Sequence, residues 1–224
     1  DNTTADAEIA NKTDVVLTSV AGNEKAIGYI SLGALNDTVK AVKVDGAEAT
    51  VDNVKAGAYK LSRPFNIATK GEPTGVAKDF INFILSKEGQ AVVTDNKYIA
   101  VNDAAESFVS DGSSGQIAVG GSSSVSPVME KLIEAYKSVN PNASIDLQTS
   151  DSTSGMTGAM DGTFAIGMAS RELKDEEAAQ LTGTAIALDG IAVIVNPANT
   201  IDELSMDQIK SIYVGDITDW GDLA

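Results

Sequence analysis

Hydrophobic and polar residues follow different periods in successive segments of this chain. Four short β-rich runs in the first half are predicted to be extended: residues 14–17, 26–32, 40–44 and 62–69. Residues 74–89 instead carry apolar side chains at helical spacing, and Gly89 is the expected end of that helix. Residues 104–115 follow neither period and have the composition of a linker.

After this linker, strand and helix patterns alternate. The predicted strands are residues 116–120, 144–148, 165–169 and 184–197, the last broken at Asp189–Gly190. The predicted helices are residues 125–139, a short helix after the turn at 149–158, residues 171–181 and residues 205–213. This alternation predicts an α/β fold with a largely parallel sheet.

Composition narrows the classes of protein that this pattern can represent. The chain has 224 residues, 43% of them hydrophobic, which suits one large domain or two small lobes. It contains no cysteine and no histidine, so disulfides, thiolate metal sites and histidine general bases are excluded, and no metal or cofactor is expected. The net charge of −16 disfavours nucleic acid and anionic membranes as partners, and no run of apolar residues is long enough for membrane insertion.

Three Ser/Thr/Gly-rich turns each follow a predicted strand, at residues 120–127, 149–158 and 167–175. Ligands of open α/β sheets bind beyond the carboxyl ends of the strands, where helix N-termini present backbone N–H groups. A single serine turn is usually only a helix cap. Three such turns at one sheet edge favour a site for an oxyanion, held by hydroxyl and N–H donors without net positive charge.

Two charged residues in these turns have alternative interpretations. Arg171 suits a bidentate contact with an oxyanion, or forms a surface ion pair with Glu172 or Asp175. Asp151 is either a local turn residue or a proton acceptor. An acceptor would favour hydrogen phosphate, which carries a proton to donate, over sulfate, which does not.

The stretches "GSSSVSPVMEKL", "DLQTSDSTSGMTGAMDGTFAIGMASREL", "IALDGIAVIVNP" and "LSMDQIKSIYVGDITDW" resemble the first half of the phosphate-binding proteins of ABC-type phosphate importers. "GNEKAIGYISLGAL", "YKLSRPFNIATK" and "DFINFILSKEGQ" resemble that family's second half. The halves stand in reversed order, so the resemblance implies a circular permutation, with the family's termini joined through "SDGSSG" and a linker of engineered appearance. Permutation is tolerated where natural termini lie close together at the surface.

The resemblance implies a two-lobed fold of the type II periplasmic-binding-protein kind, with phosphate held between the lobes. Lobe one is expected at residues 44–195, including the linker 104–115, and a reduced lobe two at residues 1–43 and 196–224. Residues 42–45 and 187–193 are the expected crossing strands.

The family's phosphate-binding positions fall on residues of the three turns: Ser123, Ser124, Ser152, Thr153, Gly155, Ser170 and Arg171. Ser170 stands where the family can have an aspartate, so Asp151 or Glu172 is the candidate proton acceptor. A further family loop, of Gly-Ser-Gly-Thr type with a nearby arginine, does not occur within residues 1–224. We therefore expect weak phosphate binding by this chain alone.

The function implied by the resemblance is binding of inorganic phosphate, without catalysis, for delivery to the membrane permease of an ABC importer. Such proteins work at the cell surface or in the periplasm, whereas this chain has the character of a recombinant soluble protein. An alternative function is an engineered, permuted scaffold or sensor module with weak or no phosphate binding. An enzyme is disfavoured, because histidine, cysteine and a G-x-S-x-G elbow are all missing.

Overall fold

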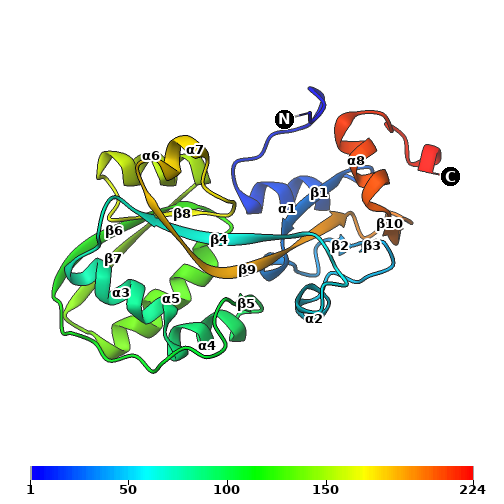
Figure 1. The fold of residues 1–224 in the computed structure, drawn as a ribbon. Coiled ribbons are helices and arrows are strands. Elements are labelled where there is room, and N and C mark those ends of the chain that lie inside the picture. Colours follow the sequence, from blue (N-terminus) through cyan, green and yellow to red (C-terminus); the bar gives the residue numbers. More distant parts are fainter. Residues whose placement is uncertain (1, 224) are drawn as a thin grey trace. The chain divides into compact units, whose positions relative to one another are not determined.

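The computed structural model describes residues 2–223, and the chain forms two compact units (Figure 1). Unit 1 comprises the residues up to Ser62 together with those from Gly190 onward, and unit 2 is Arg63–Asp189. The chain therefore passes between the units twice, once in strand β4 (Ser62–Thr69) and once in strand β9 (Thr182–Val195). Within residues 2–223, no helix combines the length and the apolar content needed to cross a membrane.

Unit 1 is built around the last residues of β9. Its elements are α1 (Thr13–Ala21), β1 (Ile27–Ser31), η1 (Leu32–Ala34), β2 (Lys40–Ala41), β3 (Lys43–Val44), α2 (Val51–Lys55), β10 (Glu203–Leu204), α8 (Met206–Val214) and η2 (Trp220–Leu223). β1 and β2 both pair antiparallel with the end of β9, and β3 pairs parallel with β10. Its small core includes Val20, Ile30 and Ile194.

Unit 2 carries the larger core and the three predicted serine turns. Its elements are β4 (Ser62–Thr69), α3 (Gly75–Leu85), α4 (Lys87–Asp95), β5 (Ile99–Ala100), β6 (Gly115–Ser122), α5 (Ser126–Val139), β7 (Ala143–Ser150), α6 (Ser152–Asp161), β8 (Ile166–Ala169), α7 (Asp175–Ala178) and the first part of β9 (Thr182–Val195). Its strands lie in the order β4-β8-β6-β7. Helices α3, α4 and α5 cover one face of this sheet, and α6 and α7 cover the other (Figure 1).

The two halves of the sequence share one core in unit 2, as predicted. Phe80 and Ile84 of α3 are fully buried in the same cluster as Val119 of β6 and Leu132 of α5. Strand β6 has a parallel partner on each side, β7 and β8. This result agrees with a rearranged order of the halves, but it does not test how that order arose, so the circular permutation stays a prediction.

The expected parallel sheet is confirmed only around β6. Strand β4 runs antiparallel to β8, and β5 runs antiparallel to β9, so the sheet is mixed. Strand β4 comes from a remote part of the sequence, and its direction cannot be read from a local alternation of strands and helices.

The prediction of a strand at residues 14–17 is wrong, because these residues lie in α1. Val16 and Val20, four residues apart, face Gly28 of β1, where a Cβ atom would come within 2.9 Å of both side chains. The apolar run thus packs as one side of a helix against a strand that has no side chain at this point. Tertiary packing overrides the β propensity of the two valines.

Gly89 does not end a helix. Helix α3 stops at Leu85, and Ser86 caps a new helix, α4, by accepting a hydrogen bond from the backbone N–H of Gly89 at 3.2 Å. The predicted helix at 171–181 is likewise reduced to α7, Asp175–Ala178. A serine cap at the start of a helix satisfies N–H groups that have no partner within the helix, which explains the restart at Lys87.

The break expected at Asp189–Gly190 is also wrong, since β9 runs unbroken from Thr182 to Val195. Asp189 is fully buried and accepts a hydrogen bond from Nε of Arg63 at 3.1 Å. Gly190 lies where a Cβ would meet Leu32 and Val54 at 3.0–3.1 Å. Asp189 is therefore a buried partner of Arg63, and Gly190 is a position without room for a side chain. Together they do not form a turn.

The division into units differs from the predicted lobes in two stretches, because residues 44–62 and 190–195 lie in unit 1 rather than with the anion-binding turns. The hydroxyl of Tyr59 donates to the carbonyl of Ile191 at 2.8 Å, and β3 pairs with β10. These bonds hold residues 44–62 within unit 1. The crossing expected at 42–45 lies in β4 instead.

The linker has more anchorage than its composition predicts. Residues 104–114 form no helix or strand, but Phe108 packs edge-on against Phe83 with ring centroids 5.3 Å apart. Ser110 and Asp111 bind the buried carboxylate of Asp79, at 2.7 Å from Ser110 Oγ and 2.9 Å from Asp111 N. These contacts attach the segment to α3 in spite of its linker composition.

Candidate functional site

The three predicted turns meet at one edge of the unit 2 sheet. β6 is parallel to both β7 and β8, with Ser122 opposite Ser150 and Gly121 opposite Met168. The carboxyl ends of the three strands therefore coincide, and the residues that follow them are neighbours. We call the hydroxyl-bearing residues of these turns the serine edge, which comprises Ser123, Ser124, Ser152, Thr153 and Ser170.

Glycines bring helix α6 unusually close to the sheet. A Cβ on Gly155 would lie 2.6 Å from the carbonyl oxygen of Met168 and 2.7 Å from the Cα of Gly121. The backbone N–H of Gly155 donates to the carbonyl of Asp151 at 3.0 Å, as in any helix. Gly155, predicted as a ligand residue, thus has a packing role: it sets the first turn of α6 against β6 and β8.

The first turn is shaped by Ser122. Its Oγ accepts from the N–H of Ser124 at 3.3 Å, and its carbonyl accepts from the N–H of Val125 at 3.0 Å. The N–H of Ser123 donates to the carbonyl of Ser150 at 3.0 Å. The backbone N–H groups of Ser123 and Ser124 are therefore used in hydrogen bonds within the protein.

The second and third turns are joined by a hydrogen bond between their serines. The N–H of Ser170 donates to Oγ of Ser152 at 3.1 Å, and the two hydroxyl oxygens are 3.5 Å apart. A hydroxyl that accepts a bond from a backbone N–H keeps its own proton for another acceptor. Ser152 is thereby set up as a hydrogen-bond donor at the carboxyl end of the sheet.

Asp151 is the N-cap of α6. Its Oδ1 accepts from the N–H of Ser154 at 2.9 Å, and its Oδ2 accepts from the hydroxyl of Ser154 at 2.8 Å. The hydrogen bonds from Ser154 hold the pKa of Asp151 below its usual range, so the carboxylate is ionised at neutral pH. The capping bonds explain why an aspartate stands at position 151. Because its carboxylate is ionised and lies next to Ser152 in the chain, Asp151 can also accept a proton from a ligand.

Arg171 is bound mainly to a carboxylate of its own unit. Its Nη1 and Nη2 donate to the two carboxylate oxygens of Glu177 at 2.7 and 2.8 Å. The partner is Glu177, rather than Glu172 or Asp175 as the sequence suggested. Glu177 is 3% exposed, and the hydrogen bonds from Arg171 outweigh its burial and keep its pKa below the usual range.

Sequence reasoning missed two residues that shape the third turn, Glu177 and Asn66. Asn66 of β4 is buried and donates from Nδ2 to the carbonyl of Arg171 at 3.0 Å. Its contact with Oε2 of Glu172, the second candidate proton acceptor, is long, at 3.4 Å. Glu177 follows Lys174 by three residues and accepts its N–H at 2.8 Å, a helix-start spacing that a closer reading of the sequence could have found. No local pattern marks Asn66.

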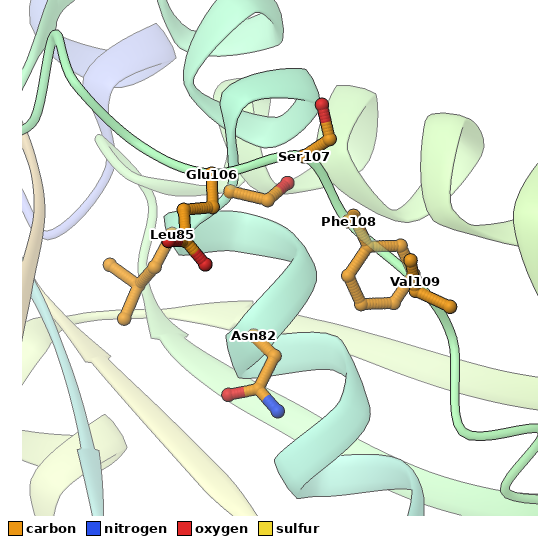
Figure 2. Close-up of a pocket in the computed structure, with 7 residues that line it drawn as sticks. Asn82, Leu85, Glu106, Ser107, Phe108 and Val109 are labelled. Carbon is orange, nitrogen blue, oxygen red and sulfur yellow. The ribbon is translucent and has the colours of Figure 1, made fainter.

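A separate surface hollow of about 370 Å³ lies beside the end of α3, lined by Asn82, Leu85, Ser86, Glu106, Ser107, Phe108 and Val109 (Figure 2). None of these residues belongs to the serine edge, and no charged donor lines the hollow. Among the described residues, no group of three or more acidic side chains is arranged to hold a metal ion. The serine edge differs from this hollow, because it brings hydroxyl groups from three turns together at the ends of parallel strands.

The sequence and fold of this chain are similar to those of known binding proteins. A sequence profile described as "PBP superfamily domain" matches residues 2–88 and 107–224. A phosphate-binding protein PstS 2 of Streptococcus agalactiae is 51% identical over 226 residues, covering 100% of this chain and 77% of that protein. The phosphate-binding protein PstS 2 of Streptococcus pneumoniae is 48% identical over 220 residues, and the match covers 98% of this chain and 76% of that protein.

A solved structure of a phosphate-binding protein of a phosphate ABC transporter from Streptococcus pneumoniae has a TM-score of 0.78. It is 47% identical in sequence, and the match covers 100% of this chain and 87% of that one. Family, relatives and fold agree: this chain belongs to the PBP superfamily and, within it, to the PstS-like phosphate-binding proteins.

Proposed function

We propose that this chain binds inorganic phosphate at the serine edge and hands it to the membrane permease of an ABC importer, without changing it chemically. The observation that supports this most directly is the register of β7, β6 and β8, which brings three hydroxyl-bearing turns to one sheet edge. The names of the relatives, phosphate-binding proteins of ABC transporters, point the same way.

The proposed site binds an anion through local dipoles, against the charge of the whole protein. The net charge is −16, so long-range attraction does not bring phosphate to the surface. Hydroxyl groups of the serine edge and the start of α6 provide donors whose effect is confined to a few ångströms. Hydrogen bonds to a charged partner are worth about 1.5–3 kcal/mol each, so a few converging donors suffice for specific binding.

Selection of phosphate over sulfate rests on an acceptor at the site, and we assign this role to Asp151. Hydrogen phosphate can donate its proton to the ionised carboxylate, whereas sulfate has no proton and would be repelled. The alternative acceptor, Glu172, is exposed and lies one residue beyond Arg171. Exchange of Asp151 for asparagine should therefore reduce the preference for phosphate more than the same exchange at Glu172, to glutamine.

Titration of the purified chain tests the proposal. Phosphate and sulfate are added separately up to about 10 mM, a range that detects even millimolar affinity, while amide signals are followed by NMR. Saturable shifts with phosphate at Ser123, Ser152 and Ser170, and weaker ones with sulfate, are expected. Absence of any saturable shift with phosphate would refute phosphate binding and leave the scaffold alternative.

The site offers little to an enzyme. The chain contains no histidine, the most frequent general base of enzymes, and no cysteine, a strong nucleophile. We accordingly propose a binding protein that acts outside the cytoplasmic membrane, where a permease can receive its ligand.

A further inference from the structure

We propose that Glu177 is a positioning residue for anion binding, which acts through Arg171 on the hydroxyl of Thr153. The inference rests on the proposed phosphate site and adds to it a residue that does not contact the ligand. In this proposal Arg171 does not contact the anion directly; it orients the hydroxyl of Thr153, which does.

Arg171 has almost no hydrogen-bonding capacity left for an anion. Nη1 donates to the carbonyl of Glu172 at 3.0 Å as well as to Glu177, and Nη2 donates to Oγ1 of Thr153 at 3.4 Å as well as to Glu177. An arginine has five N–H donors, and these four bonds use all four on the Nη atoms. Only Nε–H is left, so the bidentate grip on an oxyanion that the sequence suggested is already taken by Glu177.

The contact with Thr153 has a chemical consequence at the serine edge. Thr153 lies in the first turn of α6, next to Ser152, and its Oγ1 accepts from the charged guanidinium. A hydroxyl oxygen that accepts such a bond directs its own proton elsewhere and becomes a better donor, because hydrogen bonds in a chain polarise one another. Ser152, whose Oγ accepts from Ser170 N at 3.1 Å, has the same arrangement.

Glu177 fixes this geometry from within the protein. Its carboxylate is 3% exposed, takes both Nη atoms of Arg171 at once, and is itself held by the N–H of Lys174. Two parallel bonds define the plane of a guanidinium, which one bond cannot do. Without the second oxygen, Arg171 is free to rotate on its long side chain, and the bond to Thr153 is lost first because it is the longest.

The neighbouring Ser154 shows that the arrangement is specific. Its hydroxyl donates to Oδ2 of Asp151 at 2.8 Å, so its proton is used inside the cap. Of the three consecutive hydroxyl residues in α6, Ser152 and Thr153 can therefore donate their protons to a ligand, whereas Ser154 donates its proton to Asp151.

The test compares Glu177→Gln with Glu176→Gln, which removes the same charge from an exposed side chain of the same helix. Inorganic phosphate is titrated into each full chain, and thermal melting establishes that each is folded. We expect Glu177→Gln to weaken phosphate binding about fivefold to tenfold, as for loss of one hydrogen bond to the ligand, and Glu176→Gln to leave it unchanged.

A double-mutant cycle separates positioning from general disruption. In a Thr153→Val background, Glu177→Gln should cause no further loss, because the hydroxyl through which it acts is gone. Thr153→Ser, which retains the hydroxyl, should keep the sensitivity to Glu177→Gln. If Glu177→Gln does not fold, Arg171→Gln replaces it in the same cycle, with the same expected results.

Equal effects of the two glutamine variants, an undiminished effect in the Thr153→Val background, or tighter binding by Glu177→Gln would overturn the inference. Tighter binding would mean that a released Arg171 is itself a ligand. If the unmodified chain binds no phosphate, the proposed function fails and this inference fails with it; if the unmodified chain binds and the cycle is additive, only the inference fails.

Discussion

Replacement of Asp79 by asparagine should strongly destabilise unit 2 and release the segment before β6. Asp79 lies on α3, is 2% exposed, and accepts four hydrogen bonds. The donors are Ser110 Oγ at 2.7 Å, Asp111 N at 2.9 Å, Tyr136 Oη at 2.7 Å and Asn140 Nδ2 at 3.1 Å. One carboxylate thus joins α3, α5 and the segment that precedes β6.

The expected loss follows from the positions of the two oxygens. Three donors share Oδ2 and one, the N–H of Asp111, faces Oδ1. An asparagine can direct its single carbonyl oxygen toward the three donors that share Oδ2. Its NH₂ group then faces the N–H of Asp111, so two donors meet and neither has an acceptor. A buried unsatisfied donor costs about 1–3 kcal/mol, and loss of the charge weakens each remaining bond by about 1 kcal/mol. Since such effects are not additive, we expect a decrease of about 3–5 kcal/mol in the free energy of unfolding.

Urea denaturation followed by circular dichroism measures this loss, and hydrogen exchange of the Asp111 amide shows whether the segment is released. Asp146→Asn is the matched control: it removes the same charge from an exposed residue of β7, whose carboxylate contacts only Gln148 among the bonds described. A loss below about 1 kcal/mol for Asp79→Asn, or one equal to that of Asp146→Asn, would refute the reasoning.

The pH dependence gives a second check on the same residue. Burial alone raises the pKa of Asp79, but the bonds from Asp111, Tyr136, Ser110 and Asn140 outweigh it, so the pKa lies below the ordinary value of 3.8. A carboxyl group whose pKa is lowered in the folded state stabilises the fold above the unfolded-state pKa, and that contribution is lost as the pH falls through the folded-state pKa. The difference in stability between the wild type and Asp79→Asn should therefore be full at neutral pH and shrink below pH 3.8.

Four further variants concern the first turn of α6 and the buried ion pair of Arg63 with Asp189. Ser152→Ala should weaken phosphate binding about tenfold or more, because a donor to a charged ligand is lost. Ser154→Ala should leave the affinity unchanged, since its hydroxyl serves the helix cap; equal losses in titration would contradict this. Gly155→Ala should lower the free energy of unfolding by about 1–3 kcal/mol, because its Cβ has no room against the sheet, and an unchanged urea midpoint would count against the packing role. Asp189→Asn should cost about 3–5 kcal/mol by leaving Arg63 without its buried partner, and a thermal melt equal to that of the wild type would show that the pair contributes nothing.

Local pattern was enough to predict most elements of unit 2. The helical spacing of Phe80 and Ile84, and the strand-turn-helix order around the first serine turn, depend on side chains that are neighbours in sequence. Three turns at successive strand ends then required only that the strands be parallel to bring the serines together, which β7, β6 and β8 are. The α/β class and the position of the serine edge were predictable for this reason.

Where the fold depended on partners remote in sequence, the local pattern was misleading. Val16 and Val20 have β propensity, yet they lie in a helix, because Gly28 has no side chain and leaves room for them against β1. Asp189 and Gly190 look like a turn, yet Arg63, 126 residues away, neutralises the aspartate inside a continuous strand. Residues 104–115 look like a free linker, yet Asp79 accepts hydrogen bonds from Ser110 and Asp111.

The same distinction applies to the site. The types of residue at the serine edge and their order along the chain were determined by the sequence alone, and they suit an oxyanion site. The tertiary structure decided which donors remain for a ligand. It pairs Arg171 with Glu177, places the carboxylate of Asp151 at the N-cap of α6 beside Ser152, and packs Gly155 against the sheet. A hydrogen-bonding group has a fixed number of donors and acceptors, and only the folded chain shows which of them its own residues already use.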